Sequence, residues 1–160
     1  MDERKVPFED AQSNWKVCCE ELLLPAGLGD QKRHHVITAA QYSSLLKEEF
    51  GAKPVIFDEI FLGMGEDGHT ASLFPATDAL SIKGCYVTPN YIPQKKTWRL
   101  TLTFDALNDA ANTVFYVTGA SKADMLAHVF ASKPHLPCQL VGTVDHPALW
   151  IVDEVAAQKM

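Results

Sequence analysis

The sequence predicts an α/β fold around a mainly parallel sheet, because strand-like and helix-like patterns alternate along the chain. The almost unbroken apolar run at residues 55–62 suits the buried middle of such a sheet. It leads directly into a glycine-rich loop at residues 63–68. Since ligands bind outside the carboxyl ends of parallel strands, a functional site is expected at this loop.

The other elements follow in order from apolar spacing and helix caps. Apolar residues repeat at helical spacing over residues 15–24, and Ser13 before them is a capping residue. β-Branched residues at 34–38 predict a short strand, and the helical pattern over residues 40–50 ends at Gly51. Further strands are expected at residues 85–88, 98–104, 113–118 and 149–152, with a helix at residues 120–132.

Length and composition restrict the class of protein. A chain of 160 residues, 47% of them hydrophobic, can bury one substantial core, so residues 1–160 are expected to form a single domain. The net charge of −6 and the scattered Lys and Arg residues leave no basic stripe for nucleic acid. No apolar run approaches the roughly 20 residues of a membrane span. We therefore expect a cytoplasmic protein with neither a nucleic-acid nor a membrane partner, and no pattern predicts an oligomeric state.

The cysteines do not predict a metal site. Cys18, Cys19, Cys85 and Cys138 lack Cys-x-x-Cys spacing and have no histidines at metal-ligand intervals. They are expected to be reduced core residues, and no metal is expected.

The glycine loop admits two rival interpretations. The pattern Gly-x-Gly-x-x-Gly at residues 63–68 fits the dinucleotide-binding fingerprint, but Glu66 and Asp67 place negative charge where a pyrophosphate would bind. A serine hydrolase would use Ser72 as its nucleophile, but no Gly-x-Ser-x-Gly elbow is present to expose the hydroxyl. Ser72 is instead expected to be a residue of a short helix or a hydrogen-bond donor that shapes the loop.

His69 remains as the candidate general base. Histidine exchanges protons closest to neutral pH, and Asp67, two residues away, can select the tautomer of the ring. For a histidine by itself, an ordinary surface role would be the better interpretation. The residues around it reverse that balance.

Residues 63–75, Gly-Met-Gly-Glu-Asp-Gly-His-Thr-Ala-Ser-Leu-Phe-Pro, resemble the signature of the 6-phosphogluconolactonases, which share a superfamily with glucosamine-6-phosphate deaminases. Other segments resemble the family in the same order, at residues 2–7, 13–14, 57–58, 99–103, 118–122 and 150–157. The resemblance implies a Rossmann-like, three-layer α/β fold. It also implies that the chain matches the C-terminal portion of the family domain, without the Ser-Gly-Gly phosphate loop that comes earlier in family members.

The resemblance implies hydrolysis of 6-phospho-D-glucono-1,5-lactone to 6-phosphogluconate in the oxidative pentose phosphate pathway. His69 would activate the water and Asp67 would orient His69, with no cofactor required. The partner would be this phosphorylated sugar lactone.

Five further residues are expected to bind the substrate. Arg99 and Lys122 occupy the family's phosphate-side positions. Arg4 and the glycine-loop residues Gly65 and Gly68 would face the developing oxyanion. Without the resemblance, each cation has an ordinary interpretation. Arg99 would pair with a surface acid at a strand end, and Lys122 would be a solvated helix residue. Arg4 would belong to a charged terminus.

Two alternatives stay open. Deaminases tend to follow the histidine with Ile-Ala-Phe-Asn-Glu-Pro, whereas residues 70–75 here are Thr-Ala-Ser-Leu-Phe-Pro. That difference favours lactone hydrolysis over a deaminase or isomerase. The missing phosphate loop also fits a catalytically impaired, truncated isoform that acts as a binding or interaction protein.

Overall fold

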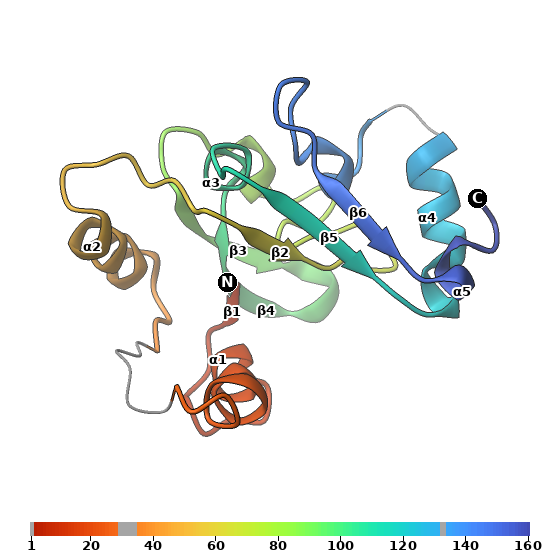
Figure 1. The fold of residues 1–160 in the computed structure, drawn as a ribbon. Coiled ribbons are helices and arrows are strands. Elements are labelled where there is room, and N and C mark those ends of the chain that lie inside the picture. The colour runs from red at the N-terminus through yellow and green to blue at the C-terminus, as the bar shows by residue number, and fades with distance from the viewer. Residues whose placement is uncertain (1, 29–34, 132–133) are drawn as a thin grey trace.

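Two three-stranded sheets form the centre of the computed structural model, which describes residues 2–28, 35–131 and 134–160 (Figure 1). The parallel sheet has the strand order β2-β5-β6, formed by β2 (Ile60–Leu62), β5 (Thr113–Val117) and β6 (Leu149–Val152). The antiparallel sheet has the order β1-β4-β3, formed by β1 (Glu3–Arg4), β4 (Thr97–Leu102) and β3 (Val87–Ile92).

The hydrophobic core joins the two sheets and includes buried residues from outside them, such as Leu46 and Leu126. Alternate residues of the parallel strands point inward, among them Leu62 on β2 and its cross-strand partner Phe115 on β5. Leu100 and Leu102 on β4 belong to the same buried cluster. Burial of these apolar side chains is the main stabilising contribution to the fold, at roughly 1.5–3 kcal/mol for each large side chain.

Short helices connect the strands, and their ends match local sequence signals. Ser13 caps α1 because its side chain accepts a hydrogen bond from the Lys16 N–H. Thr38 caps α2 by accepting from the Gln41 N–H. Gly51 ends α2 with a positive φ of 61°. The α-helices are α1 (Asn14–Cys18), α2 (Ala39–Phe50), α3 (Phe104–Asn108), α4 (Ala123–Ala131) and α5 (Glu154–Ala157). Other helical turns are η1 (Cys19–Leu23, π), and the 3₁₀ turns η2 (Asp78–Ser81), η3 (Pro93–Lys95), η4 (Ala120–Lys122) and η5 (Pro137–Leu140).

The predicted α/β class is confirmed, together with a parallel sheet that contains the strand before the glycine loop. The strand predicted at residues 34–38 is wrong for its described part. Residues 35–37 are not in a strand, and Thr38 caps α2; residue 34 lies outside the described residues. The sequence also did not predict the antiparallel sheet.

Several strand boundaries differ from the prediction. The run at residues 55–62 forms a strand only from Ile60, where the regular pairing with β5 begins at Thr113. Before that point the Ala111 N–H donates to the Phe57 carbonyl at 2.9 Å, but residues 55–59 are not part of a strand. The strand expected at residues 98–104 ends at Leu102, since Thr103 caps α3 by accepting from the Ala106 N–H. The strand expected at residues 85–88 corresponds to β3, which begins at Val87 and extends to Ile92.

One face of the parallel sheet carries no helix among the described residues, and Figure 1 shows it turned toward the viewer. It exposes Phe61 (69%), Tyr116 (60%), Leu149 (59%) and Ile151 (44%), which we call the open sheet face. Parallel sheets are usually covered on both faces, so this exposure is unusual.

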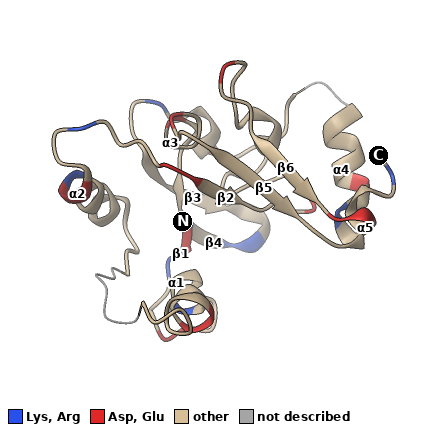
Figure 2. Cartoon of the chain, viewed as in Figure 1, with Lys and Arg blue, Asp and Glu red and all other residues tan. Residues whose placement is uncertain are grey.

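Charged residues are scattered over the described chain and do not join into one basic stripe (Figure 2). None of the described helices has the length and apolar content to cross a lipid bilayer.

Candidate active site

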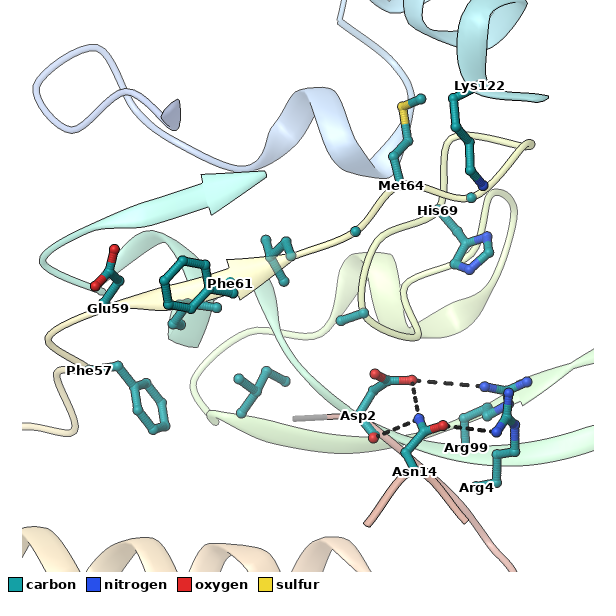
Figure 3. Close-up of a pocket in the computed structure, with 16 residues that line it drawn as sticks. Asp2, Arg4, Asn14, Phe57, Glu59, Phe61, Met64, His69, Arg99 and Lys122 are labelled. Atoms are coloured by element: carbon teal, nitrogen blue, oxygen red, sulfur yellow. Dashed lines mark hydrogen bonds and ion pairs between the residues drawn. The ribbon is translucent and has the colours of Figure 1, made fainter. Parts of the chain in front are cut away.

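A pocket of about 620 Å³ lies at the carboxyl end of β2, next to the glycine-rich loop. Both sheets contribute to it, together with the start of α1 and the end of η4 (Figure 3). Its charged and polar side chains are Asp2, Arg4, Asn14, Glu59, His69, Arg99 and Lys122. The pocket is thus located where the strand-then-loop pattern predicts it.

Two glycines give the loop its shape. The Gly65 N–H donates to the His69 carbonyl at 2.8 Å, and the Gly68 N–H donates to the Gly65 carbonyl at 3.0 Å. A Cβ at Gly65 would collide with the imidazole of His69 and lie 2.7 Å from Asp67 Oδ1. Gly68 has a φ of 76°, and a Cβ there would lie 2.9 Å from Leu136 Cδ1. A larger residue at Gly65 would therefore displace the histidine, and one at Gly68 would be strained and would press on Leu136.

His69 and Asp67 form a hydrogen-bonded pair in this loop. Nδ1 of His69 lies 2.5 Å from Oδ1 of Asp67, and the His69 backbone N–H donates to the same oxygen at 3.2 Å. Partial burial raises the pKa of Asp67, but hydrogen bonds from His69 and attraction to that side chain outweigh burial and lower this pKa below its ordinary value.

This pairing selects one tautomer of the ring. An ionised carboxylate can only accept hydrogen bonds, so Nδ1 of His69 carries the proton that is shared with Asp67. The other nitrogen, Nε2, is then left with a free lone pair. Because His69 lines the pocket, this arrangement provides a base for a molecule bound there.

Arg99 is a buried cation of the pocket. Only 9% of its side chain is exposed, and its Nε makes no hydrogen bond to the described residues. Its nearest acid is Asp2, with Nη1 to Oδ2 at 3.8 Å. Burial, and then the charge of Arg4, lower the pKa of Arg99, while Asp2 and Glu3 oppose this. The guanidinium stays charged, so an anion in the pocket would find unsatisfied donors.

Arg4 is held in place by the start of α1. Its Nη1 donates to the Gln12 carbonyl at 2.6 Å and to Oδ1 of Asn14 at 2.8 Å. The amide of Asn14 in turn donates to the Asp2 carbonyl at 3.1 Å. In Figure 3 the heads of Arg4 and Arg99 lie side by side.

Lys122 extends into the pocket from the end of η4, near His69 (Figure 3). Its ammonium has no hydrogen bond or ion pair with a described residue. Together with the two arginines it gives the pocket a positive character that suits a phosphorylated ligand.

The structure brings most of the predicted site residues together. Those that line the pocket are His69, Arg4, Gly65, Arg99 and Lys122, and Asp67 contacts it through His69. Gly68 does not line the pocket, and the N–H groups of both glycines are already bonded within the loop. Their observed contribution is the shape of the loop, and substrate contact by either glycine stays a prediction.

Ser72 is fully buried, and its Oγ donates to Asp2 Oδ2 at 2.7 Å. Its hydroxyl is thus a donor, but the acceptor belongs to Asp2 and not to the loop, so a loop-shaping role stays a prediction. Its burial argues against a nucleophile. Sequence reasoning missed Asn14 as a bridge between Asp2 and Arg4. Its signals were its place directly after the capping Ser13 and the resemblance of residues 13–14 to the family.

Among the described residues, no group of three His, Cys, Asp or Glu side chains could hold a metal ion. The cysteines are unpaired there, with Cys19 and Cys138 buried and Cys85 exposed. Cys85 therefore departs from the expected core position, while no disulfide links the four residues.

The fold and the pocket define an α/β protein with a histidine–carboxylate pair and a cationic ligand site at the carboxyl edge of its parallel sheet. The chain belongs to the family of glucosamine-6-phosphate isomerases and 6-phosphogluconolactonases, which matches residues 1–150.

Individual relatives agree with this assignment. The chain is 42% identical to a 6-phosphogluconolactonase of Chlamydia trachomatis over 65% of this chain and 41% of that protein. It is 34% identical to one of Bos taurus over 98% of this chain and 65% of that protein. A solved 6-phosphogluconolactonase structure from Thermotoga maritima superposes with a TM-score of 0.75 and 31% identity, covering 94% of this chain and 69% of that one. The chain therefore spans less than two thirds of the length of these two curated relatives.

Proposed function

We propose that this chain hydrolyses 6-phospho-D-glucono-1,5-lactone to 6-phosphogluconate, with His69 as the general base. The observation that carries the proposal is the 2.5 Å contact between His69 Nδ1 and Asp67 Oδ1 at the edge of a cationic pocket. Relatives named 6-phosphogluconolactonase, matched over nearly the whole of this chain, support the choice of reaction.

The proposed reaction begins at Nε2 of His69. With Nδ1 protonated and bonded to Asp67, Nε2 takes a proton from water while the water oxygen attacks the lactone carbonyl carbon. The resulting tetrahedral oxyanion collapses, the bond between the carbonyl carbon and the ring oxygen breaks, and the imidazolium returns its proton to that ring oxygen. The products are the open-chain acid and the original form of His69.

Two negative charges need stabilisation in this reaction, on the phosphate and on the oxyanion. Arg4, Arg99 and Lys122 supply the matching positive charge. Arg99 contributes most as a binding group, because its buried guanidinium has few partners in the protein and loses little solvation when an anion arrives.

The test is lactone hydrolysis by the purified chain, corrected for spontaneous hydrolysis, with His69→Ala as the key variant. We expect the catalysed rate to fall by about 100-fold or more, the usual contribution of a general base. His146→Ala, in an exposed loop before β6, is the matched control and should keep the full rate.

The proposal fails if folded wild-type protein shows only the background rate, and His69→Ala does not change it. In that case the catalytic role of His69 in this chain is refuted. Ammonia release from glucosamine 6-phosphate would instead support a deaminase.

A further inference from the structure

The imidazole of His69 is stacked on the ring of Phe74. The ring centroids are 3.9 Å apart, and the planes differ by 13°. Phe74 is almost completely buried, with 1% of its surface exposed, whereas a quarter of the His69 side chain, 24%, is accessible to solvent. A fixed aromatic ring therefore supports a partly exposed one.

The backbone that carries Phe74 is itself anchored. Its carbonyl accepts a hydrogen bond from Thr77 Oγ1 at 2.7 Å. The buried amide of Asn90 donates to the Ser72 carbonyl at 2.8 Å and to Thr77 Oγ1 at 3.0 Å. These bonds connect the segment before and after Phe74 to β3, so the phenyl ring cannot follow the imidazole if that ring rotates.

Three contacts together determine the orientation of the imidazole. Asp67 holds Nδ1 by a hydrogen bond, and Gly65 leaves room for the Nδ1–Cε1 edge because it has no side chain. The face of Phe74 restricts rotation out of the stacked plane. Without that face, the ring could rotate about its Cβ–Cγ bond, which would separate Nδ1 from Asp67 and move Nε2.

We propose that Phe74 is a positioning residue that keeps the imidazole of His69 in the tautomer and orientation required of a general base. It does not touch the reacting atoms and acts only through His69. The kinetic part of this inference rests on the proposed lactone hydrolysis, whereas its effect on the imidazole does not.

A phenyl face also suits the charge that His69 acquires during the reaction. When Nε2 takes a proton, the ring becomes a cation, and aromatic faces attract cations. Lys95 Nζ lies 5.6 Å from the centroid of the same phenyl ring, so Phe74 already contacts one positive charge. Stacking therefore contributes both to position and to stabilisation of the protonated intermediate.

The kinetic test compares Phe74→Leu with Phe115→Leu. Phe115 is equally buried and stacks on Trp150 with centroids 4.0 Å apart, but it lies outside the pocket. We expect Phe74→Leu to lower kcat by about 10- to 100-fold with KM changed less than about twofold, since misplacing a catalytic group affects the chemical step. Phe115→Leu should lose comparable stability and keep its kcat.

A spectroscopic test separates this inference from the proposed function. Long-range ¹H–¹⁵N spectra of the histidine rings should show a single Nδ1-protonated form for His69 in the wild type and in Phe115→Leu. Phe74→Leu should show a mixture of both tautomers, and Phe74→Tyr, which keeps the ring, should restore the single form. Phe74→Met serves as the ringless variant if the leucine variant does not fold.

The outcomes are distinct. An unchanged His69 tautomer in the ringless variant, or an equal loss of kcat in the Phe74 and Phe115 variants, overturns the positioning role. A changed tautomer in a chain without any lactone hydrolysis supports the positioning role and refutes the proposed function instead.

Discussion

Arg4 and Arg99 are direct partners across the antiparallel pair of β1 and β4, and both face the same pocket. Like charges opposite each other on neighbouring strands are destabilising. Asp2, 3.8 Å from Arg99, and the neighbouring Glu3 offset this in part, whereas Asn14 binds Arg4 without adding charge. The pair therefore favours an anion in the pocket.

Inorganic phosphate should stabilise the folded chain through this pair. At ten times its dissociation constant, a ligand that binds only the folded state adds about 1.4 kcal/mol, which corresponds to roughly 3–5 °C in Tm for a chain of this size. Arg99→Gln should abolish the shift in a thermal denaturation series with increasing phosphate. Lys83→Gln, a change at an exposed lysine outside the pocket, should keep it. An equal shift in both variants would contradict a phosphate site at Arg99.

Gly65→Ala should impair catalysis while the chain stays folded. Its Cβ would collide with His69 and Asp67, so the loop has to move the pair, and we expect kcat/KM for the lactone to fall by about 100-fold. The far-ultraviolet circular dichroism spectrum should stay unchanged, since the loop lies outside both sheets. Gly63→Ala, where no atom lies within 4 Å of the added Cβ, should leave the imidazole signals of His69 as they are. Full activity in Gly65→Ala would refute the role of the pair.

Asp67 should contribute to stability in a pH-dependent manner. Its pKa is lower in the folded chain than its ordinary value of 3.8, so it stabilises the fold above that value, and the contribution disappears as the pH falls through the folded pKa. The unfolding free energy of the wild type should exceed that of Asp67→Asn at neutral pH, and the difference should shrink below about pH 4. Because 48% of this side chain is exposed, the effect is small.

Urea unfolding between about pH 3 and pH 7, followed by tryptophan fluorescence, measures this difference. Asp145→Asn, at an exposed loop position, is the control. A difference that is independent of pH would show that the carboxylate charge does not contribute.

The cysteines should differ sharply in reactivity. Burial raises the pKa of Cys138 to about 11, and its side chain is inaccessible, so almost no thiolate is available near pH 8. Iodoacetamide should label the exposed Cys85 in the folded chain and Cys138 only in denaturant, as measured by mass spectrometry of peptides. Labelling of both at one rate would mean that the helical turn around Cys138 opens readily.

Local features of the fold were predictable from the sequence. The caps Ser13 and Gly51 and the strand β6 follow from short patterns, because they depend on neighbouring residues. The same is true of His69 and Asp67, which lie two residues apart in a glycine loop and so meet without help from the rest of the chain.

The features that were missed depend on contacts between distant segments. Glu3 pairs with Leu100, and no local pattern indicates that such a short strand at the amino end joins β4. The bridge from Asn14 to Arg4 and the stack of Phe74 on His69 require tertiary packing. The strand expected at residues 34–38 shows the reverse error, since β propensity alone does not provide a partner strand.

Finally, the open sheet face has a practical consequence for every experiment proposed above. Phe61 belongs both to that face and to the pocket, so anything that shields the face from water also changes the entrance to the site. Apolar surface of this kind promotes association as protein concentration rises. Rates and melting temperatures should therefore be measured over a dilution series. Values extrapolated to low protein concentration then describe the pocket of the monomeric chain.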